Sequence, residues 1–281
     1  MKNRYKLFLF LALLLCGAGI SAQTGQPFEV KVTGHGKQAI LFIPGFACSG
    51  DVWRETLAKY EKKYVCYTLT MAGFAGVPAQ ANSSFAIWES AIANYIIEKK
   101  INKPIVIGHS MGGLLALALA ADHPGLISRI VVVDALPCLQ AMMNPSFKSV
   151  EKPDCGATVQ TIVDMNEEQF LAMQKMSMQR LIADTVHQAE VLQWSMRSAR
   201  KAFAEMYCDF SNIDLRDRIA TIKCPSLILL ESYFANMKPA ISQQYTKLQT
   251  GQYEYATKGL HFIMYDDPDW YQAQLAKFLK H

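Results

Sequence analysis

Short apolar runs alternate with amphipathic segments along the first half of the chain. Residues 28–33 alternate apolar and polar side chains, as in a strand at the edge of a sheet. Further strands, almost continuously apolar, are predicted at residues 39–43, 64–69, 104–107 and 130–133. Helical spacing marks residues 51–60, 85–100 and 114–120. Strands that alternate with helices in this way predict a mostly parallel sheet with helices on both faces, an α/β fold.

The pattern changes after Pro137. Residues 138–212 show helical spacing, as at 167–182 and 188–206, and hold eight of the 13 methionines. Flexible, polarizable methionine side chains suit a pliable apolar roof over a substrate. Strand and helix patterns then resume, with strands predicted at residues 225–230 and 252–256 and helices at 239–249 and 270–279. The middle of the chain is therefore predicted to be a helical insertion between two strands.

One short motif lies between the apolar run 104–107 and the helical pattern 114–120. Residues 108–113 read Gly-His-Ser-Met-Gly-Gly, which contains Gly-x-Ser-x-Gly. In a strand–turn–helix context this motif is a nucleophile elbow, whose tight turn leaves room only for small residues at Gly108 and Gly112. The turn exposes the Ser110 hydroxyl beside the helix N-terminus, where backbone N–H groups favour developing negative charge. Ser110 is the predicted nucleophile.

These features resemble a serine hydrolase of the alpha/beta-hydrolase superfamily, of the type with a helical cap. The resemblance covers nearly all of the chain after residue 27 and weakens between about 138 and 210. It implies the alpha/beta-hydrolase fold, with a first core part at residues 23–137, a helical cap at 138–212 and a second core part at 213–281. It also implies the chain order serine, acid, histidine for the catalytic groups.

The oxyanion hole is expected from two backbone amides. The strand at 39–43 ends at Pro44-Gly45-Phe46, where the resembled family often has His-Gly-x and uses the N–H of x. Pro44 departs from the usual histidine, but the donor is backbone and is kept. We therefore expect the N–H groups of Phe46 and Met111 to hold the oxyanion.

The predicted base is His261, which follows the last strand in a Gly-x-His-Phe setting like the family's histidine loop. The position of the triad acid in the chain is less usual. Most of the superfamily carries it after the strand at 225–230, but there the chain reads Glu231-Ser-Tyr-Phe-Ala-Asn, with no aspartate. Some relatives, certain haloalkane dehalogenases among them, carry the acid one core strand earlier, where this chain has Asp134. Asp134 is the predicted acid and Glu231 the alternative.

A Ser110–His261–Asp134 triad predicts acyl transfer through an acyl-enzyme, with a small apolar carboxylic ester as the substrate. Serine at the elbow argues against epoxide hydrolase or dehalogenase chemistry, which needs a carboxylate nucleophile. An aminopeptidase, a lactonase or a C–C bond hydrolase on the same triad remains an alternative. An aminopeptidase needs a carboxylate pair in the cap; Glu167-Glu168 is available, but two adjacent helix residues point apart, which favours a solvated face. A non-catalytic ligand-binding protein of this fold is the alternative from another class. Neither cofactor nor metal is indicated.

The N-terminus is typical of a secretory signal. Lys2, Arg4 and Lys6 precede an apolar run, and small residues up to Ala22 offer a cleavage site, so residues 1–22 are predicted to be a signal peptide. Export to the periplasm or the extracellular space is expected, with no stable membrane anchor after cleavage. Without these three basic residues the chain has 25 basic and 24 acidic residues, a net charge of +1, which gives no electrostatic footprint for nucleic acid.

Six cysteines follow the predicted signal peptide. An even number in an exported chain indicates disulfides, but six cysteines allow 15 pairings, and the sequence does not choose among them. No pair has C-x-x-C spacing, so a zinc or thioredoxin-type site is not indicated. The six are Cys48, Cys66, Cys138, Cys155, Cys208 and Cys224. The oligomeric state is equally left open.

Overall fold

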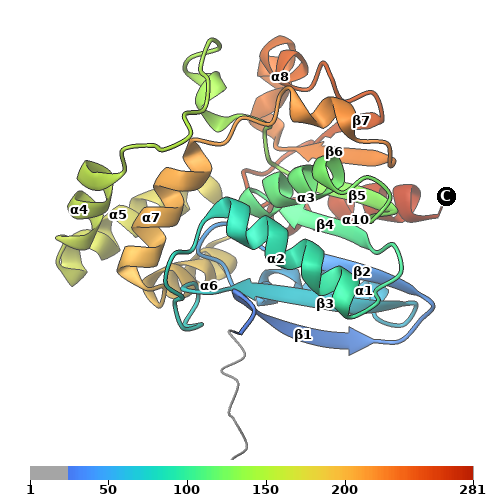
Figure 1. The fold of residues 1–281 in the computed structure, drawn as a ribbon, viewed down its shortest axis with the longest axis horizontal. Helices are drawn as coiled ribbons and strands as arrows, with labels where there is room; N and C mark the ends of the chain where they lie inside the picture. The colour runs from blue at the N-terminus through green and yellow to red at the C-terminus, as the bar shows by residue number, and fades with distance from the viewer. Residues whose placement is uncertain (1–24, 281) are drawn as a thin grey trace, which may run out of the picture.

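The computed structural model describes residues 25–280, in which a seven-stranded sheet is flanked by helices (Figure 1). The predicted signal peptide lies outside these residues. The strands are β1 (Phe28–Gly34), β2 (Gln38–Ile43), β3 (Tyr64–Met71), β4 (Ile105–His109), β5 (Arg129–Val133), β6 (Ser226–Leu230) and β7 (Gly251–Tyr255). Their order in the sheet is β1-β3-β2-β4-β5-β6-β7. Only β1 runs antiparallel to its neighbour, so the predicted mostly parallel sheet is confirmed.

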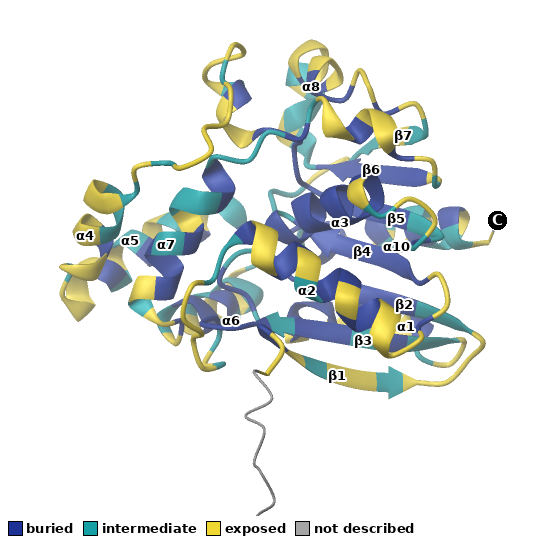
Figure 2. Ribbon diagram, viewed as in Figure 1, coloured by how far each residue is buried: buried dark blue, intermediate teal, exposed yellow. Residues whose placement is uncertain are grey.

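Helices cover both faces of the sheet and bury two apolar clusters. The side chains of each central strand alternate between the clusters: Leu41 and Ile43 of β2 face one, Ile40 and Phe42 the other. The first cluster is closed by α2 (Phe85–Glu98), α3 (Met111–Asp122) and α8 (Lys238–Gln244). The second is closed by α1 (Arg54–Tyr60), α9 (Ile263–Asp266) and α10 (Pro268–Leu279). This double burial explains why the central strands β2, β4, β5 and β6 are apolar almost throughout (Figure 2).

A helical cap is inserted between β5 and β6. Its helices are α4 (Gly156–Val163), α5 (Glu167–Leu181), α6 (Thr185–Met196) and α7 (Arg200–Ser211), and they lie to one side of the sheet in Figure 1. Side-chain caps begin two of them: Asn166 and Gln169 form a reciprocal capping box at α5, and Asp184 accepts from the first turn of α6. The exact residues at which the cap begins and ends, 138 and 212, stay a prediction.

The expectation of one helical stretch over residues 188–206 is wrong, because α6 ends at Met196 and α7 begins at Arg200. The Ala199 N–H donates to the Gly73 carbonyl and the Ser198 hydroxyl accepts from the Ala75 N–H, both in the loop after β3. These long-range bonds replace the helical bonds at the break, and periodicity cannot reveal them.

Two predicted helices differ from the structure at one end. The segment expected as one helix at 51–60 starts as a 3-10 turn at Gly50–Trp53, and the helix expected at 239–249 ends already at Gln244. The other 3-10 turns lie at Leu139–Met142, Arg218–Thr221 and Ser232–Met237.

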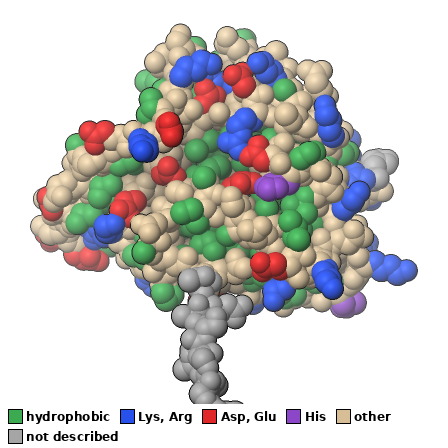
Figure 3. Space-filling model, in the orientation of Figure 1, with side chains coloured by type: hydrophobic (Ala, Val, Ile, Leu, Met, Phe, Trp, Pro, Cys, Tyr) green, Lys and Arg blue, Asp and Glu red, His purple; other side chains and the backbone are tan. Residues whose placement is uncertain are grey.

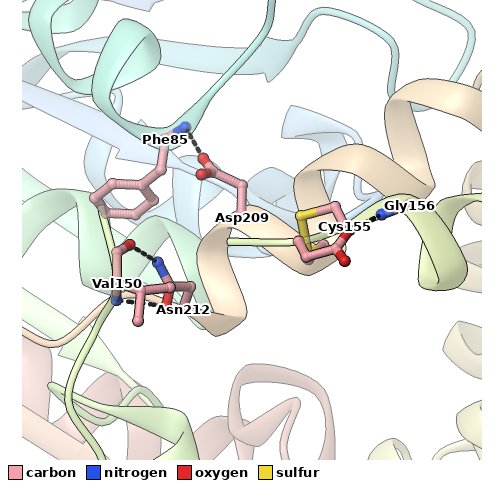
Figure 4. Close-up of a disulfide and its surroundings, with 8 residues drawn as sticks. Phe85, Val150, Cys155, Gly156, Asp209 and Asn212 are labelled. Carbon is pink, nitrogen blue, oxygen red and sulfur yellow. Dashed lines mark hydrogen bonds between the residues drawn. A yellow bond between two sulfur atoms is a disulfide. The ribbon is translucent and has the colours of Figure 1, made fainter. Parts of the chain in front are cut away.

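A disulfide joins α4 to α7 within the cap. Cys155, the residue before α4, is bonded to Cys208 of α7, with their Cα atoms 5.8 Å apart. The next residue, Asp209, accepts a hydrogen bond of 2.6 Å from the Phe85 N–H at the start of α2, as Figure 4 shows. Helix α7 therefore ties α4 to the core. The remaining described cysteines are free thiols: Cys48, Cys66, Cys138 and Cys224.

The surface drawn in Figure 3 intersperses basic and acidic side chains. Within residues 25–280, no helix has both the length and the apolar character needed to cross a membrane.

Candidate active site

Ser110 occupies a sharp turn between β4 and α3, as predicted from the motif. Its backbone has φ 54° and ψ −122°, a strained conformation for a residue other than glycine. The turn closes so tightly that a Cβ atom on Gly108 would lie 2.0 Å from the Gly112 carbonyl oxygen, and one on Gly112 would lie 2.3 Å from that of Ile43. Both glycines are therefore required by contact, and the strain at Ser110 is held by the surrounding structure.

A cavity of about 500 Å³ lies between the carboxyl ends of the strands and the cap. Ser110, His261, Asp134 and Glu231 all line it, so the topology brings the sequence-predicted residues into one site. Most of the remaining wall is apolar and comes from both the core and the cap: Leu114, Leu136, Ile162, Met173, Met178, Val191, Phe203 and Phe210.

Asp134 is the carboxylate that contacts His261. Its Oδ2 atom lies 2.6 Å from His261 Nδ1, and its side chain is only 1% exposed. Its other oxygen, Oδ1, accepts a hydrogen bond of 2.7 Å from the backbone N–H of Glu231. Both oxygens of Asp134 are thus in use. The Nδ1 proton is held by the carboxylate, which leaves Nε2 of His261 as the basic nitrogen.

The charges around His261 raise its pKa. Burial alone lowers the pKa, but the hydrogen bond to Asp134 and the negative charges of Asp134 and Glu231 outweigh it, so the pKa is raised above its usual 6.5. Glu231 is affected by the same crowding: burial and the charge of Asp134 raise its pKa to about 7, although His261 opposes this. Glu231 therefore changes its charge near neutral pH beside the histidine.

Two backbone N–H groups in the cavity wall have no hydrogen-bond partner within residues 25–280. They belong to Phe46, in the loop after β2, and Met111, the first residue of α3. The N–H at the start of a helix has no acceptor within the helix and carries the positive end of its dipole. Both residues line the cavity with Ser110, so the two donors expected for an oxyanion are available at the site.

His109 supports the loop that carries His261, a role that the sequence did not reveal. Its Nε2 atom lies 3.0 Å from the His261 carbonyl oxygen, and the centres of the two rings are 4.6 Å apart. Burial and then the charge of His261 lower the pKa of His109, so its ring is neutral and Nε2 is the donor to the carbonyl. No motif distinguishes this role, because His109 already belongs to the elbow.

Asp266 joins the same loop to the cap. Its carboxylate accepts from the Leu260 N–H at 2.8 Å, and also from the Ala183 and Asp184 N–H groups at 3.0 Å, between α5 and α6. The Phe262 N–H donates to the Leu181 carbonyl at 3.2 Å. The residues on either side of His261 are therefore bonded to the cap. An acidic residue soon after a histidine loop is the only sequence signal of this junction.

The structure also locates the carboxylate pair that an aminopeptidase would need. Glu167 and Glu168 are exposed in the first turn of α5 and do not line the cavity, and Glu167 pairs with Arg200. This carboxylate pair is therefore not placed to hold a substrate ammonium group there. Across the described residues, no group of three or more His, Cys, Asp or Glu side chains is arranged to hold a metal ion.

Comparison with known proteins agrees with this architecture. A family model described as alpha/beta hydrolase fold matches residues 38–268. The chain belongs to this family.

Its alpha/beta-hydrolase relatives include the pimeloyl-[acyl-carrier protein] methyl ester esterase of Vibrio cholerae. The two chains are 26% identical over 204 residues, which cover 71% of this chain and 76% of the relative. The esterase of the same name from Edwardsiella ictaluri is 24% identical over 196 residues, 69% of this chain and 74% of the relative. The alpha/beta-hydrolase chain is accordingly a hydrolase of the esterase type.

Solved structures share the alpha/beta-hydrolase fold at lower identity. MenH from S. aureus superposes with a TM-score of 0.74 at 16% identity, covering 91% of this chain and 98% of that one. The enol-lactonase from Burkholderia xenovorans LB400 gives the same TM-score and identity, with 90% and 96% covered. At this level of identity, the two structures show that the fold is shared.

Proposed function

We propose that this alpha/beta-hydrolase is an exported esterase that cleaves a small carboxylic ester with an apolar acyl part. One observation carries the proposal: His261 is paired with the buried carboxylate of Asp134 in the cavity that Ser110 lines from a strained turn. Nucleophile, base and orienting acid are the three parts of a serine-hydrolase triad.

The reaction follows from these groups. Nε2 of His261 takes the Ser110 hydroxyl proton while Oγ attacks the ester carbonyl, and Asp134 stabilises the imidazolium that forms. The oxyanion accepts hydrogen bonds from the Phe46 and Met111 N–H groups. His261 then gives its proton to the departing alkoxide. Water, activated by the same histidine, hydrolyses the acyl-enzyme and frees Ser110.

The largely apolar cavity supports an apolar acyl group, and its volume fits a small molecule. The cap supplies much of the wall, so we assign substrate selection to residues 138–212. Relatives whose names specify a methyl ester add support for ester chemistry. A lactone is a cyclic ester and would pass through the same steps.

Covalent labelling tests the proposed nucleophile. The folded protein is treated with a fluorophosphonate probe and digested, and the modified peptide is identified by mass spectrometry. An activated serine at the elbow predicts modification of Ser110 alone, and heat-unfolded protein is the control that should not react. Absence of labelling in folded protein, together with a ligand-induced rise in Tm, would favour a non-catalytic binding protein instead.

The acid limb of the pH–rate profile follows from the raised pKa of His261. The base must be neutral, so kcat/KM is expected to fall on acidification at a pH above 6.5, the usual value for histidine. Glu231→Gln removes one of the negative charges that raise this pKa, so the acid limb should move to lower pH. Profiles of kcat/KM for both proteins check this. An unmoved limb in Glu231→Gln would show that Glu231 does not influence the base.

The export part of the proposal has two supports. Residues 1–22 have the basic, apolar and small-residue pattern of a signal peptide, and the cap contains a disulfide, which persists in oxidising compartments. Cell fractionation with the intact mass of the purified protein tests it. A mature chain that begins at Gln23 in the periplasm or medium is the expected result, and an uncleaved chain retained in the cytosol would contradict it.

A further inference from the structure

The cap wall of the cavity contains a buried polar pair in mostly apolar surroundings. Gln174 of α5 is 4% exposed and Ser195 of α6 is 2% exposed, and both line the cavity. The Ser195 hydroxyl donates to Gln174 Oε1 at 2.7 Å. This bond joins the two helices and fixes the orientation of the Gln174 amide.

The pair leaves one polar group of Gln174 unused. A glutamine amide has a carbonyl oxygen and an NH₂ group with two donors. Ser195 occupies the oxygen, whereas Nε2 makes no hydrogen bond among the described residues and is not one of the fully enclosed unpartnered atoms. Since Gln174 is nearly fully buried and lines the cavity, these donors face the cavity. Water in the cavity satisfies these donors in the free protein, so a substrate group that displaces this water binds best when it offers an acceptor of its own.

The neighbouring polar groups do not replace this donor. On α5 the cavity is lined by residues 173, 174, 177, 178 and 181, which lie on one side of the helix, and by the exposed Arg180. Apart from Arg180, only Gln174 and Ser177 are polar, and the Ser177 hydroxyl already donates to the Met173 carbonyl. Arg180 and Tyr207 also line the cavity, but both are exposed. Gln174 is therefore the buried, neutral donor of this wall.

We infer that Gln174 determines specificity by donating a hydrogen bond to a carbonyl oxygen within the acyl chain of the substrate. The inference rests on the proposed esterase function and deepens it: the preferred ester has a keto or amide carbonyl along an otherwise apolar chain. A neutral donor matches a neutral acceptor. A purely hydrocarbon chain would displace water from the amide and leave its N–H groups unpaired, which selects against such substrates.

Matched esters test the inference. The substrates are p-nitrophenyl octanoate and a series of p-nitrophenyl octanoates with one keto group, each at a different carbon. The quantity measured is the ratio of kcat/KM for each keto ester to that for the plain ester. Wild type is compared with Gln174→Met, which keeps the side-chain length and removes the donors, and with Gln174→Glu, which replaces the donors by an acceptor. Gln179→Met is the matched control, because Gln179 is exposed on the same helix and does not line the cavity.

We expect wild type and Gln179→Met to prefer at least one keto ester by about tenfold or more. Both Gln174 variants should bring that ratio close to one. A role of Gln174 in folding alone would slow all esters equally and leave the ratio unchanged, which would overturn the inference. So would hydrolysis of all esters by wild type at similar rates, although the proposed function would then stand. If wild type hydrolyses none of them, both are overturned.

Discussion

Asp134→Asn should lower kcat/KM by about 10,000-fold, the loss of rate seen when the orienting acid of a triad is converted to its amide. Asparagine keeps the size of the side chain, and it tolerates the positive φ of 49° at this position as well as aspartate does. What changes is the partner of His261 Nδ1, now 2.6 Å from a carboxylate oxygen. An amide provides no negative charge and can hold the ring in the wrong tautomer. Steady-state kinetics on a p-nitrophenyl ester measure the loss.

Glu231→Gln is the matched control for this prediction. The Glu231 backbone N–H that bonds to Asp134 Oδ1 is kept, and the side chain makes no hydrogen bond to His261 among the described contacts. At a pH where His261 is neutral in both proteins, kcat/KM should stay within about tenfold of wild type. The reverse pattern, with a large loss in Glu231→Gln and little in Asp134→Asn, would assign the acid to Glu231.

Cys155→Ser/Cys208→Ser should lower the free energy of unfolding by about 4 kcal/mol, because the bond closes a loop with a sequence separation of 53 residues. The loss should be concentrated at α4, which is largely exposed in Figure 2 and whose only buried residue is Ile162. Ile162 also lines the cavity, so release of α4 removes part of the cavity wall. Urea denaturation measures the overall change, and limited proteolysis shows whether cleavage begins around α4.

Cys224→Ser is the control for general effects of cysteine replacement, because this thiol is free and only half-buried. It should unfold at nearly the same urea concentration as wild type. Addition of a reductant should destabilise wild type and leave the double variant unchanged. Equal stability of wild type with and without reductant would mean that packing, and not the disulfide, holds α4.

The sequence was most informative where local rules determine the structure. The elbow could be predicted because glycine is the only residue type that fits at positions 108 and 112. The central strands could be predicted because burial on both faces makes them apolar. The positions of Ser110, Asp134 and His261 in one cavity follow from the parallel topology, since strand ends gather at one edge of the sheet.

Long-range contacts were beyond the sequence. The break between α6 and α7 depends on bonds to Gly73 and Ala75, more than a hundred residues earlier. The Cys155–Cys208 pairing is one of many that the cysteine count allows. The pairing of Gln174 with Ser195, which places the amide donors at the cavity, depends on the packing of α5 beside α6. In each case the deciding partner is set by tertiary structure.

The hydrogen bonds of Asp266 link the attachment of the cap to activity when the protein is heated or treated with denaturant. The same carboxylate holds the backbone before His261 and the backbone between α5 and α6. Detachment of the cap at this junction would withdraw a support of His261, the proposed base, even with all three residues of the proposed triad intact. Cap attachment and catalytic competence would then be one equilibrium, and the enzyme would become inactive in a partly open form before the sheet itself unfolds.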